Sequence, residues 1–340
     1  MTNAVGLDGP AMLLMPLPGE LPGSPAPVGA RLTGLIEELG TSGYTAAMGS
    51  DPDAPAARAE LLARLAALPD ETIPLSGEPP AGSCVHDAFF EVRRGLGDSA
   101  ALLAGAVLVS DVLVREDLAA SGSTLEEDPD DLLLGVTGFL TGTLLPAVKA
   151  GPWQPARPVE AANRRWLVGH QRFFVMLQLL TVALRRLDRP DATAAQEEAA
   201  VRSFGWLCRS TAVSMRYAAD FPPELYAEVR ETMTPPAVNA GFSGLQTRDH
   251  QELVNWMRRL KHRGGLDRLD PASRTAVHAA VQHLYDAHVW VCDRFGGSAE
   301  PSLLMAQAAQ AAGERAESGV AAAERLAHRR LRYLTPTGAA

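Results

Sequence analysis

Two side chains that can bind a metal or a cofactor stand one helical turn apart near the C-terminal end of the chain. In the stretch YDAHVWVCDRFGG, residues 285–297, His288 is followed four positions later by Cys292. Such groups are scarce, because the chain has only 8 histidines and 3 cysteines in 340 residues. Residues four apart on a helix lie above one another on one face. The two side chains are therefore expected to share one environment.

The surrounding sequence predicts that this face is buried. Asp270 is a residue type that caps helix N-termini, and Pro271 suits the first helical position. Apolar residues then recur at steps of four, three, seven and four: Val277, Val281, Leu284, Val291 and Phe295. His288 falls on this stripe and Cys292 follows one turn later, so both are expected to point into the protein.

Three interpretations of the pair are open from the residues alone. The first is a core histidine beside a buried cysteine that acts as a small apolar side chain. The second is a zinc site, which needs two further ligands, but His283 is off the stripe and His250 is distant in sequence. The third is a haem site, with His288 on the iron and Cys292 at the porphyrin edge. The pattern is not the C-x-x-C-H of c-type cytochromes, so the pair alone does not choose between them.

The rest of the chain predicts an all-α helical bundle that would hold these residues. Stretches with apolar residues at three- and four-residue spacing alternate with prolines, and alternating β-branched runs are nearly absent. The longest stretch is PVEAANRRWLVGHQRFFVMLQLLTVALRRL. Residues 1–30 are rich in proline and glycine and predict a flexible leader. A single all-α domain is expected over residues 31–335.

Composition limits the class of partner. The hydrophobic fraction of 46% allows a large core, and the formal net charge of −9 argues against nucleic acid or an anionic membrane. Three cysteines do not form a disulfide framework. The N-terminus lacks the basic region of a secretory signal, and no membrane-spanning helix is expected, because glycine or proline interrupts every long apolar run. These features predict a cytoplasmic protein.

Three stretches, in a fixed order, resemble the tryptophan 2,3-dioxygenase-like superfamily of histidine-ligated haem enzymes. They are RRWLVGHQRFFVMLQLL, PPELYAEVRETMTPPAVNAGFSGLQTRDHQEL and HVWVCDRFGGS. The superfamily has an H-Q pair on a helix, then T-P-x-E-[FY]-x-x-[FL]-R leading to S-G-F-Q-S-x-Q-[YF]-R, then H-x-x-x-V-x-R-x-I-G. The positions in register are His170, Gly241, Phe242, Gln246, Arg248, His288, Arg294 and Gly296. The resemblance covers residues 160–310.

The resemblance implies a haem bound between helices and a role for each matched residue. His288 would be the proximal iron ligand. His170 would lie on the distal side next to the oxidant, with Trp166 one turn before it as part of the wall. Arg248, together with Phe242, would bind the amino acid substrate, since a guanidinium can pair bidentately with its carboxylate. Without the order of the motifs, an ordinary salt bridge for Arg248 and a core position for His170 would be the favoured interpretations.

Two departures from the wider pattern resemble the branch of 3-methyl-L-tyrosine hydroxylases that serve saframycin-type antibiotic pathways. Cys292 stands where the superfamily has valine, and His250 follows two residues after Arg248, which gives H-x(n)-H-x-x-x-C. In that branch the cysteine forms a thioether to the porphyrin, and both histidines can bind iron. A residue one turn after a ligand lies about 6 Å along the helix, where a vinyl group at the ring edge would be. The resemblance thus implies covalent haem at Cys292 and a second iron ligand at His250.

The function predicted in this way is hydroxylation of L-tyrosine or 3-methyl-L-tyrosine beside the phenol, with hydrogen peroxide or dioxygen as oxidant and a catechol as product. His170 and His250 would be the catalytic side chains and His288 the axial donor. Relatives are dimers or tetramers, so a homo-oligomer is expected. Gly296 and Gly297 serve either a mobile lid or a plain helix C-cap. The alternatives are a tryptophan or indole oxygenase of the same fold, a haem-binding protein without turnover, and a helical interaction scaffold.

Overall fold

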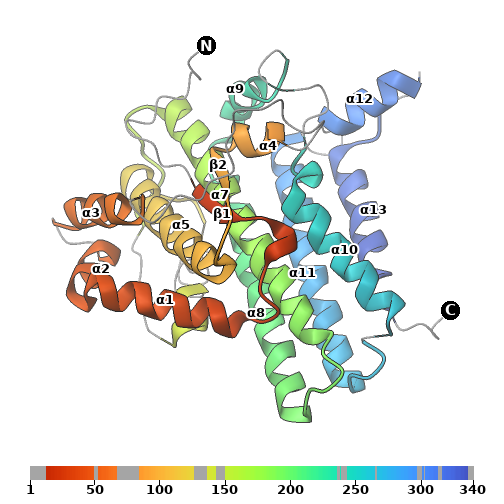
Figure 1. Cartoon of the computed structure of the whole chain (residues 1–340). Coiled ribbons are helices and arrows are strands. Elements are labelled where there is room, and N and C mark those ends of the chain that lie inside the picture. The colour runs from red at the N-terminus through yellow and green to blue at the C-terminus, as the bar shows by residue number, and fades with distance from the viewer. Residues whose placement is uncertain are drawn as a thin grey trace.

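The computed structural model is almost entirely helical, which confirms the predicted all-α class (Figure 1). It describes residues 13–49, 53–66, 84–125, 136–142, 150–235, 238, 243–264, 266–296, 301, 303–312 and 316–335. The named helices are α1 (Pro25–Leu39), α2 (Thr41–Met48), α3 (Ala54–Ala66), α4 (Cys84–Phe89), α5 (Ser99–Ser121), α7 (Pro158–Leu187), α8 (Ala194–Ala218), α9 (Tyr226–Thr232), α10 (Arg248–His262), α11 (Pro271–Gly296), α12 (Leu303–Ala312) and α13 (Gly319–Leu331). Short 3₁₀ turns are η1 (Pro18–Glu20), η2 (Pro223–Leu225) and η3 (Gly244–Gln246).

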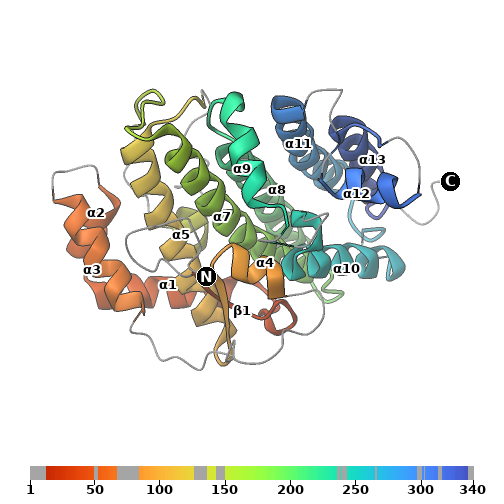
Figure 2. The ribbon, with the colours of Figure 1, turned by 90° about the horizontal axis from the view of Figure 1, so that it is seen from above.

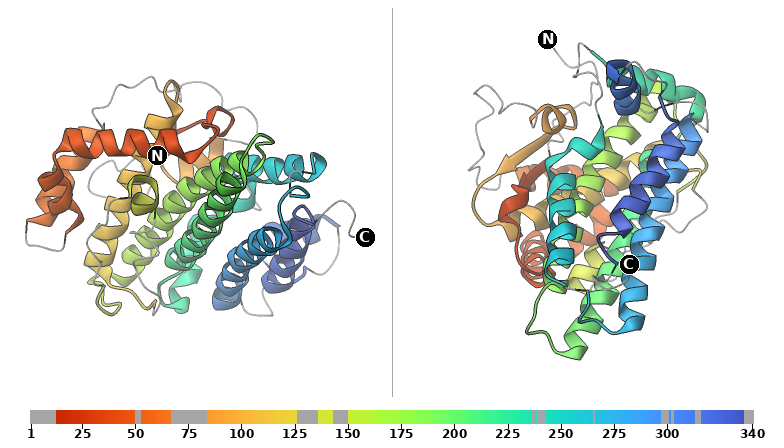
Figure 3. Two further views of the ribbon diagram at one scale, coloured as in Figure 1. Left: turned by 90° about the horizontal axis from the view of Figure 1, so that it is seen from below. Right: turned by 90° about the vertical axis from the view of Figure 1, so that its right-hand side faces the viewer.

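The long helices form one layer in chain order. Helix α5 packs on α7, α7 on α8, α8 on α11, and α11 on α13. Seen from above, this row crosses the molecule, and α1, β1 and α10 lie along one side of it (Figure 2). The view from below shows the same row running from yellow through green to blue (Figure 3). A ligand site between α7, α8 and α11 is therefore at the centre of the bundle.

Helix α7 is the core of this layer. Most of its residues from Leu167 onward are buried, because its neighbours α5, α8 and α10 cover it on several sides. Among the described helices, α7 alone is long and apolar enough to cross a membrane, judged by length and composition only. Its apolar stretch is mostly buried inside the protein, as in the core helix of a large bundle.

The N-terminal segment differs from the predicted leader from Leu13 onward. Strand β1 (Leu13–Pro16) pairs in parallel with β2 (Val92–Gly95), and Leu13 and Met15 have no exposed surface. Helix α1 then begins at Pro25. The prolines and glycines of this segment separate short elements rather than prevent them, and residues 1–12 lie outside the described part of the chain.

Helices α7 and α8 approach each other closely at Gly169. A Cβ at this position would lie 2.4 Å from both the Cα and the Cβ of Ala218. Real Cβ atoms do not come so near, so the absence of a side chain here sets the distance between the two helices that carry much of the central layer.

We expect Gly169→Ala to lower the free energy of unfolding by about 1–3 kcal/mol, because the helices must move apart. Gly105→Ala is the matched control, since nothing lies within 4 Å of a Cβ at that position of α5. This control should be neutral or stabilising by up to about 1 kcal/mol. Chemical denaturation measures both changes. Equal stability of the two variants would show that the close approach is not a constraint.

Candidate active site

The histidines singled out in the sequence converge on one cavity of about 240 Å³. Its walls come from α7, α8, α9, α10, α11, α13 and η3, and they are mostly apolar and aromatic. His170, His250 and His288 all line it, and so do Cys292 and Trp166. No aspartate, glutamate or lysine is among the described lining residues. Such a pocket suits a largely apolar ligand held by a few polar groups.

Helix α11 presents the His288–Cys292 pair to this cavity as the sequence predicts. Asp270 Oδ1 accepts hydrogen bonds from the backbone N–H groups of Ala272 at 2.8 Å and Ser273 at 3.0 Å, so it caps the helix. Cys292 Sγ lies 4.0 Å from His288 Nε2. Burial lowers the pKa of His288 and raises the pKa of Cys292 to about 11. At neutral pH the imidazole is therefore uncharged and the thiol keeps its proton.

His170 on α7 is a neutral imidazole with one defined tautomer. Its Nδ1 lies 2.8 Å from the carbonyl oxygen of Trp166, and a carbonyl can only accept, so Nδ1 carries the proton. Burial lowers the pKa of His170 to about 4, and the bond to Trp166 offsets this only in part. The ring stacks on Phe90 with centroids 4.4 Å apart. Nε2 thus keeps its lone pair at pH 7.

His250 on α10 is held in the same way. Its Nδ1 donates to the carbonyl oxygen of Leu245 at 3.1 Å, and its backbone N–H donates to the Thr247 side chain at 3.3 Å. Burial, followed by the nearby charge of Arg330, lowers the pKa of His250 to about 4. The interaction with His288 lowers this pKa further. Both imidazoles line the same cavity, so two neutral rings can meet one ligand.

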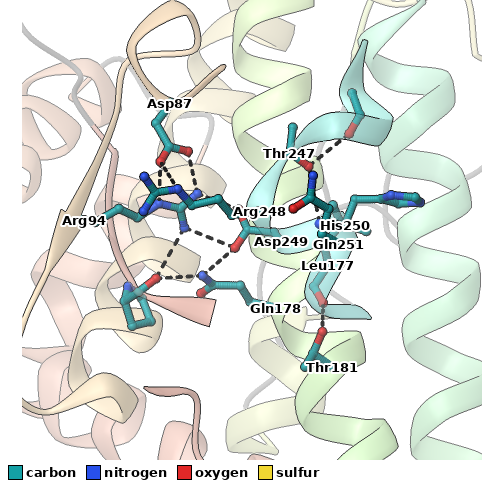
Figure 4. A network of polar contacts seen from close by, with 12 residues as sticks. Asp87, Arg94, Leu177, Gln178, Thr181, Thr247, Arg248, Asp249, His250 and Gln251 are labelled. Atoms are coloured by element: carbon teal, nitrogen blue, oxygen red, sulfur yellow. Dashed lines mark hydrogen bonds and ion pairs between the residues drawn. The ribbon is translucent and has the colours of Figure 1, made fainter. Parts of the chain in front are cut away.

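A buried ion-pair network fixes the start of α10 (Figure 4). Arg94 Nη2 lies 2.6 Å from Asp87 Oδ1 and 2.6 Å from Asp249 Oδ2. Gln178 of α7 donates to Asp249 Oδ1 at 2.8 Å and to the carbonyl oxygen of Pro16 at 2.9 Å. Burial would lower the pKa of Arg94, but the two carboxylates, Asp249 above all, raise it overall. The residue before His250 is therefore locked to α4, β1, β2 and α7.

The structure does not bring Arg248 to the cavity. Its Nε lies 3.8 Å from Asp87 Oδ2, and its side chain points away from that of His250 (Figure 4). Arg230 of α9 lines the cavity instead, and its Nη2 donates to the carbonyl oxygen of Pro301 at 3.3 Å. It belongs to the same P-P-E-L-Y-A-E-V-R motif but was not singled out in the sequence. Its spacing of four from Tyr226, another lining residue, was the available signal.

Aromatic rings close one end of the cavity. Tyr226 stacks on Phe295 at 4.1 Å, and Trp166 lies 6.3 Å from Phe295 between ring centroids. The Trp166 Nε1–H is buried and has no hydrogen-bond partner among the described residues. Trp166 and Phe295 point inward as the sequence predicted, whereas Tyr226 was not singled out in the sequence. Phe242, Gly241, Gly297 and Ser298 lie outside the described residues.

The chain is similar to proteins of a known family. A family described as SfmD 3-methyl-L-tyrosine peroxygenase matches residues 14–281. The chain is 33% identical to a 3-methyl-L-tyrosine peroxygenase of Streptomyces lavendulae over 282 residues, which cover 74% of this chain and 75% of that protein. The chain belongs to the 3-methyl-L-tyrosine peroxygenase family. Membership confirms the resemblance read from the motifs, and with it the prediction of an enzyme that is an oxidoreductase.

A solved structure supports the same peroxygenase fold. The crystal structure of reduced SfmD, obtained by soaking with sodium hydrosulfite, matches with a TM-score of 0.61 and 26% identity. The match covers 84% of this chain and 98% of that chain. The bundle described above is therefore the fold of this peroxygenase family.

The described residues fit an iron carried in a macrocycle better than a metal held by side chains alone. No group of three or more His, Cys, Asp or Glu side chains is placed for a metal in the described ranges, so the zinc alternative finds no further ligands there. A haem iron needs only one or two axial donors and apolar walls. His288 and His250 supply neutral imidazoles at such walls. The donor set therefore fits a haem.

We expect His170 to make the cofactor-free protein sensitive to acid. Its pKa is about 4 in the folded state and about 6.5 in an unfolded chain. Below pH 6.5 the unfolded state therefore binds the proton first, and stability falls by up to about 1.4 kcal/mol per pH unit until pH 4. His170→Phe should remove this part of the slope in denaturation experiments at pH 6.5 and pH 5. An unchanged slope would contradict a buried neutral imidazole.

Proposed function

We propose that the protein is a haem-dependent hydroxylase that converts L-tyrosine or 3-methyl-L-tyrosine into a catechol, with hydrogen peroxide as oxidant. One peroxide oxygen would enter the ring C–H bond beside the phenol, and the other would leave as water. The observation that carries the proposal is the meeting of His288, Cys292 and His250 at one apolar cavity. The peroxygenase name of the 33% identical relative supports peroxide rather than dioxygen.

The residues on α11 and α10 would hold the cofactor. His288 would be the first iron donor and His250 the second, because burial keeps both imidazoles neutral and both line the cavity. Cys292 would form a thioether at the ring edge, where its S–H adds across a vinyl group and the thiol proton moves to carbon. When bound, the haem supplies the activation of peroxide. If His250 holds the cofactor at rest, it would have to give up that position before peroxide could bind there.

His170 would prepare the phenol for attack. Its Nε2 holds the free lone pair, because Nδ1 is committed to the Trp166 carbonyl. A neutral imidazole in this position can accept the phenol proton and make the ring more electron-rich. The aromatic wall of Trp166, Tyr226 and Phe295 would pack against the substrate ring and exclude water.

Arg230 would bind the substrate carboxylate. It is the one arginine among the described lining residues, and no lysine accompanies it. The sequence assigned this task to Arg248, but its Nε lies 3.8 Å from Oδ2 of the buried Asp87. The acidic composition and the burial of α7 support a cytoplasmic enzyme. The homo-oligomer stays a prediction.

The cofactor and its linkage can be tested together. Purified protein should show a haem spectrum, and acid–acetone should leave the haem on the chain, visible as added mass in denaturing mass spectrometry. Cys292→Ala should release its haem in acid–acetone. Cys208→Ala is the control, because Cys208 is fully buried and is not among the lining residues. A colourless protein would refute the haem, and complete extraction from wild type would refute the thioether. Oxygen-18 peroxide should label the catechol.

We expect Arg230→Met to raise the dissociation constant of L-tyrosine by roughly 30-fold or more, because a charge-assisted pair in a desolvated pocket contributes about 2–5 kcal/mol. Binding of tyramine, which lacks the carboxylate, should change little. Arg248→Met is the paired variant. Titration of the haem spectrum measures the binding of L-tyrosine and of tyramine to each of the two variants. If only Arg248→Met weakens L-tyrosine, the assignment made from the sequence is right and that of Arg230 is wrong.

A further inference from the structure

A buried arginine without a carboxylate partner lies next to the cavity. Arg330 of α13 is 8% exposed, and its buried Nε has no hydrogen-bond partner. No aspartate or glutamate oxygen lies within 4.0 Å of it in the described part of the chain. A buried charge without a partner costs several kcal/mol, so such groups are rare unless a ligand completes them.

The other buried arginines of the described interior show what is usual in this protein. Arg94 pairs with Asp87 and Asp249, while Arg172 lies 2.6 Å from Asp111. Arg165 has Asp220 at 2.9 Å. Arg58 and Arg115 feel the charges of Glu116 and Asp111, and both donate to backbone carbonyl oxygens. Arg330 differs from these, because its described polar partners are the hydroxyls of Tyr285 and Tyr333.

The position of Arg330 is at the corner where α10, α11 and α13 meet. It follows one turn after Leu326, which lines the cavity. It acts on two further lining residues, His250 through its charge and Tyr285 through its charge and a hydrogen bond. Its other described contact is with Tyr333, whose ring lies 5.8 Å away and whose hydroxyl also accepts a hydrogen bond from it. Burial raises the pKa of Tyr285 to about 12, so its hydroxyl keeps a proton that it can donate.

We propose that Arg330 and the Tyr285 hydroxyl bind a carboxylate of a ligand that occupies the cavity. Arg330 can only donate, and the Tyr285 hydroxyl, whose oxygen accepts from Arg330, keeps its own proton to donate, so a carboxylate can accept from both. Arg330 acts on His250 of α10 and Tyr285 of α11, whereas Arg230 comes from α9 beside the aromatic wall. The carboxylate that reaches Arg330 is therefore a porphyrin side chain rather than the amino acid. This inference rests on the proposed function, because the ligands are the haem and its substrate.

The test compares ligands with and without the carboxylate. Full-length protein carrying Cys292→Ala, so that binding stays reversible, is titrated with haem and with haem dimethyl ester. Arg330→Met should weaken the binding of haem about tenfold or more, the loss expected for a charge-assisted hydrogen bond. The binding of the ester should be unchanged. Arg330→Lys should retain much of the haem affinity. Arg329→Met is the control, because it removes the same charge from an exposed position of α13.

Two calorimetric titrations, one with L-tyrosine and one with tyramine, test whether Arg330 binds the carboxylate of the amino acid instead of that of haem. If Arg330→Met weakens L-tyrosine but neither haem nor tyramine, the site exists and takes the amino acid. The proposal is overturned if Arg330→Met loses affinity equally for haem and its ester, or loses affinity for none of the ligands. If wild type binds no haem, the proposed function fails, and the amino acid titrations still decide whether Arg330 binds a carboxylate.

Discussion

The pairing of Arg94 with Asp87 and Asp249 is the constraint on which the site depends. It joins β2, α4 and α10, and Gln178 extends it to α7 and β1. A buried ion pair is weak evidence for stability, because desolvation offsets much of the attraction. Removing one partner, however, leaves a bare charge inside the protein and costs about 3–5 kcal/mol. The network therefore restricts the start of α10 to one arrangement.

That arrangement decides what His250 and Arg248 can do. The two residues flank Asp249 at the N-terminus of α10, where successive side chains leave the helix in different directions. With Asp249 held by Arg94, His250 points to the cavity and Arg248 toward Asp87. The Leu245 carbonyl then fixes the His250 tautomer. One buried contact, that of Asp249 with Arg94, thus turns His250 toward the cavity and Arg248 away from it.

Local patterns allowed part of this to be predicted from the sequence. The stripe of α11 and its Asp270 cap are set by spacing and by the capping residue, so the inward direction of His288 and Cys292 followed directly. The pairing of Leu13 with Val92 joins distant segments, and composition cannot reveal it. Arg248 and Arg230 both lie in matched motifs, and only the tertiary partner Asp87 separates them. The order of three short motifs was enough to identify the family, because each motif places one wall of the same cavity.

Charge placement links the fold to the kind of ligand it can take. The chain carries a formal net charge of −9, yet no carboxylate is among the described residues that line the cavity. Buried arginines of α5 and α7 lie near aspartates away from it, so the interior is neutralised there. Beside the cavity the charged side chains are basic: Arg230 lies in the wall, and Arg330 is hydrogen-bonded to Tyr285 of the wall. A ligand that brings its own carboxylates would pair with these arginines, whereas a cationic ligand would meet like charge.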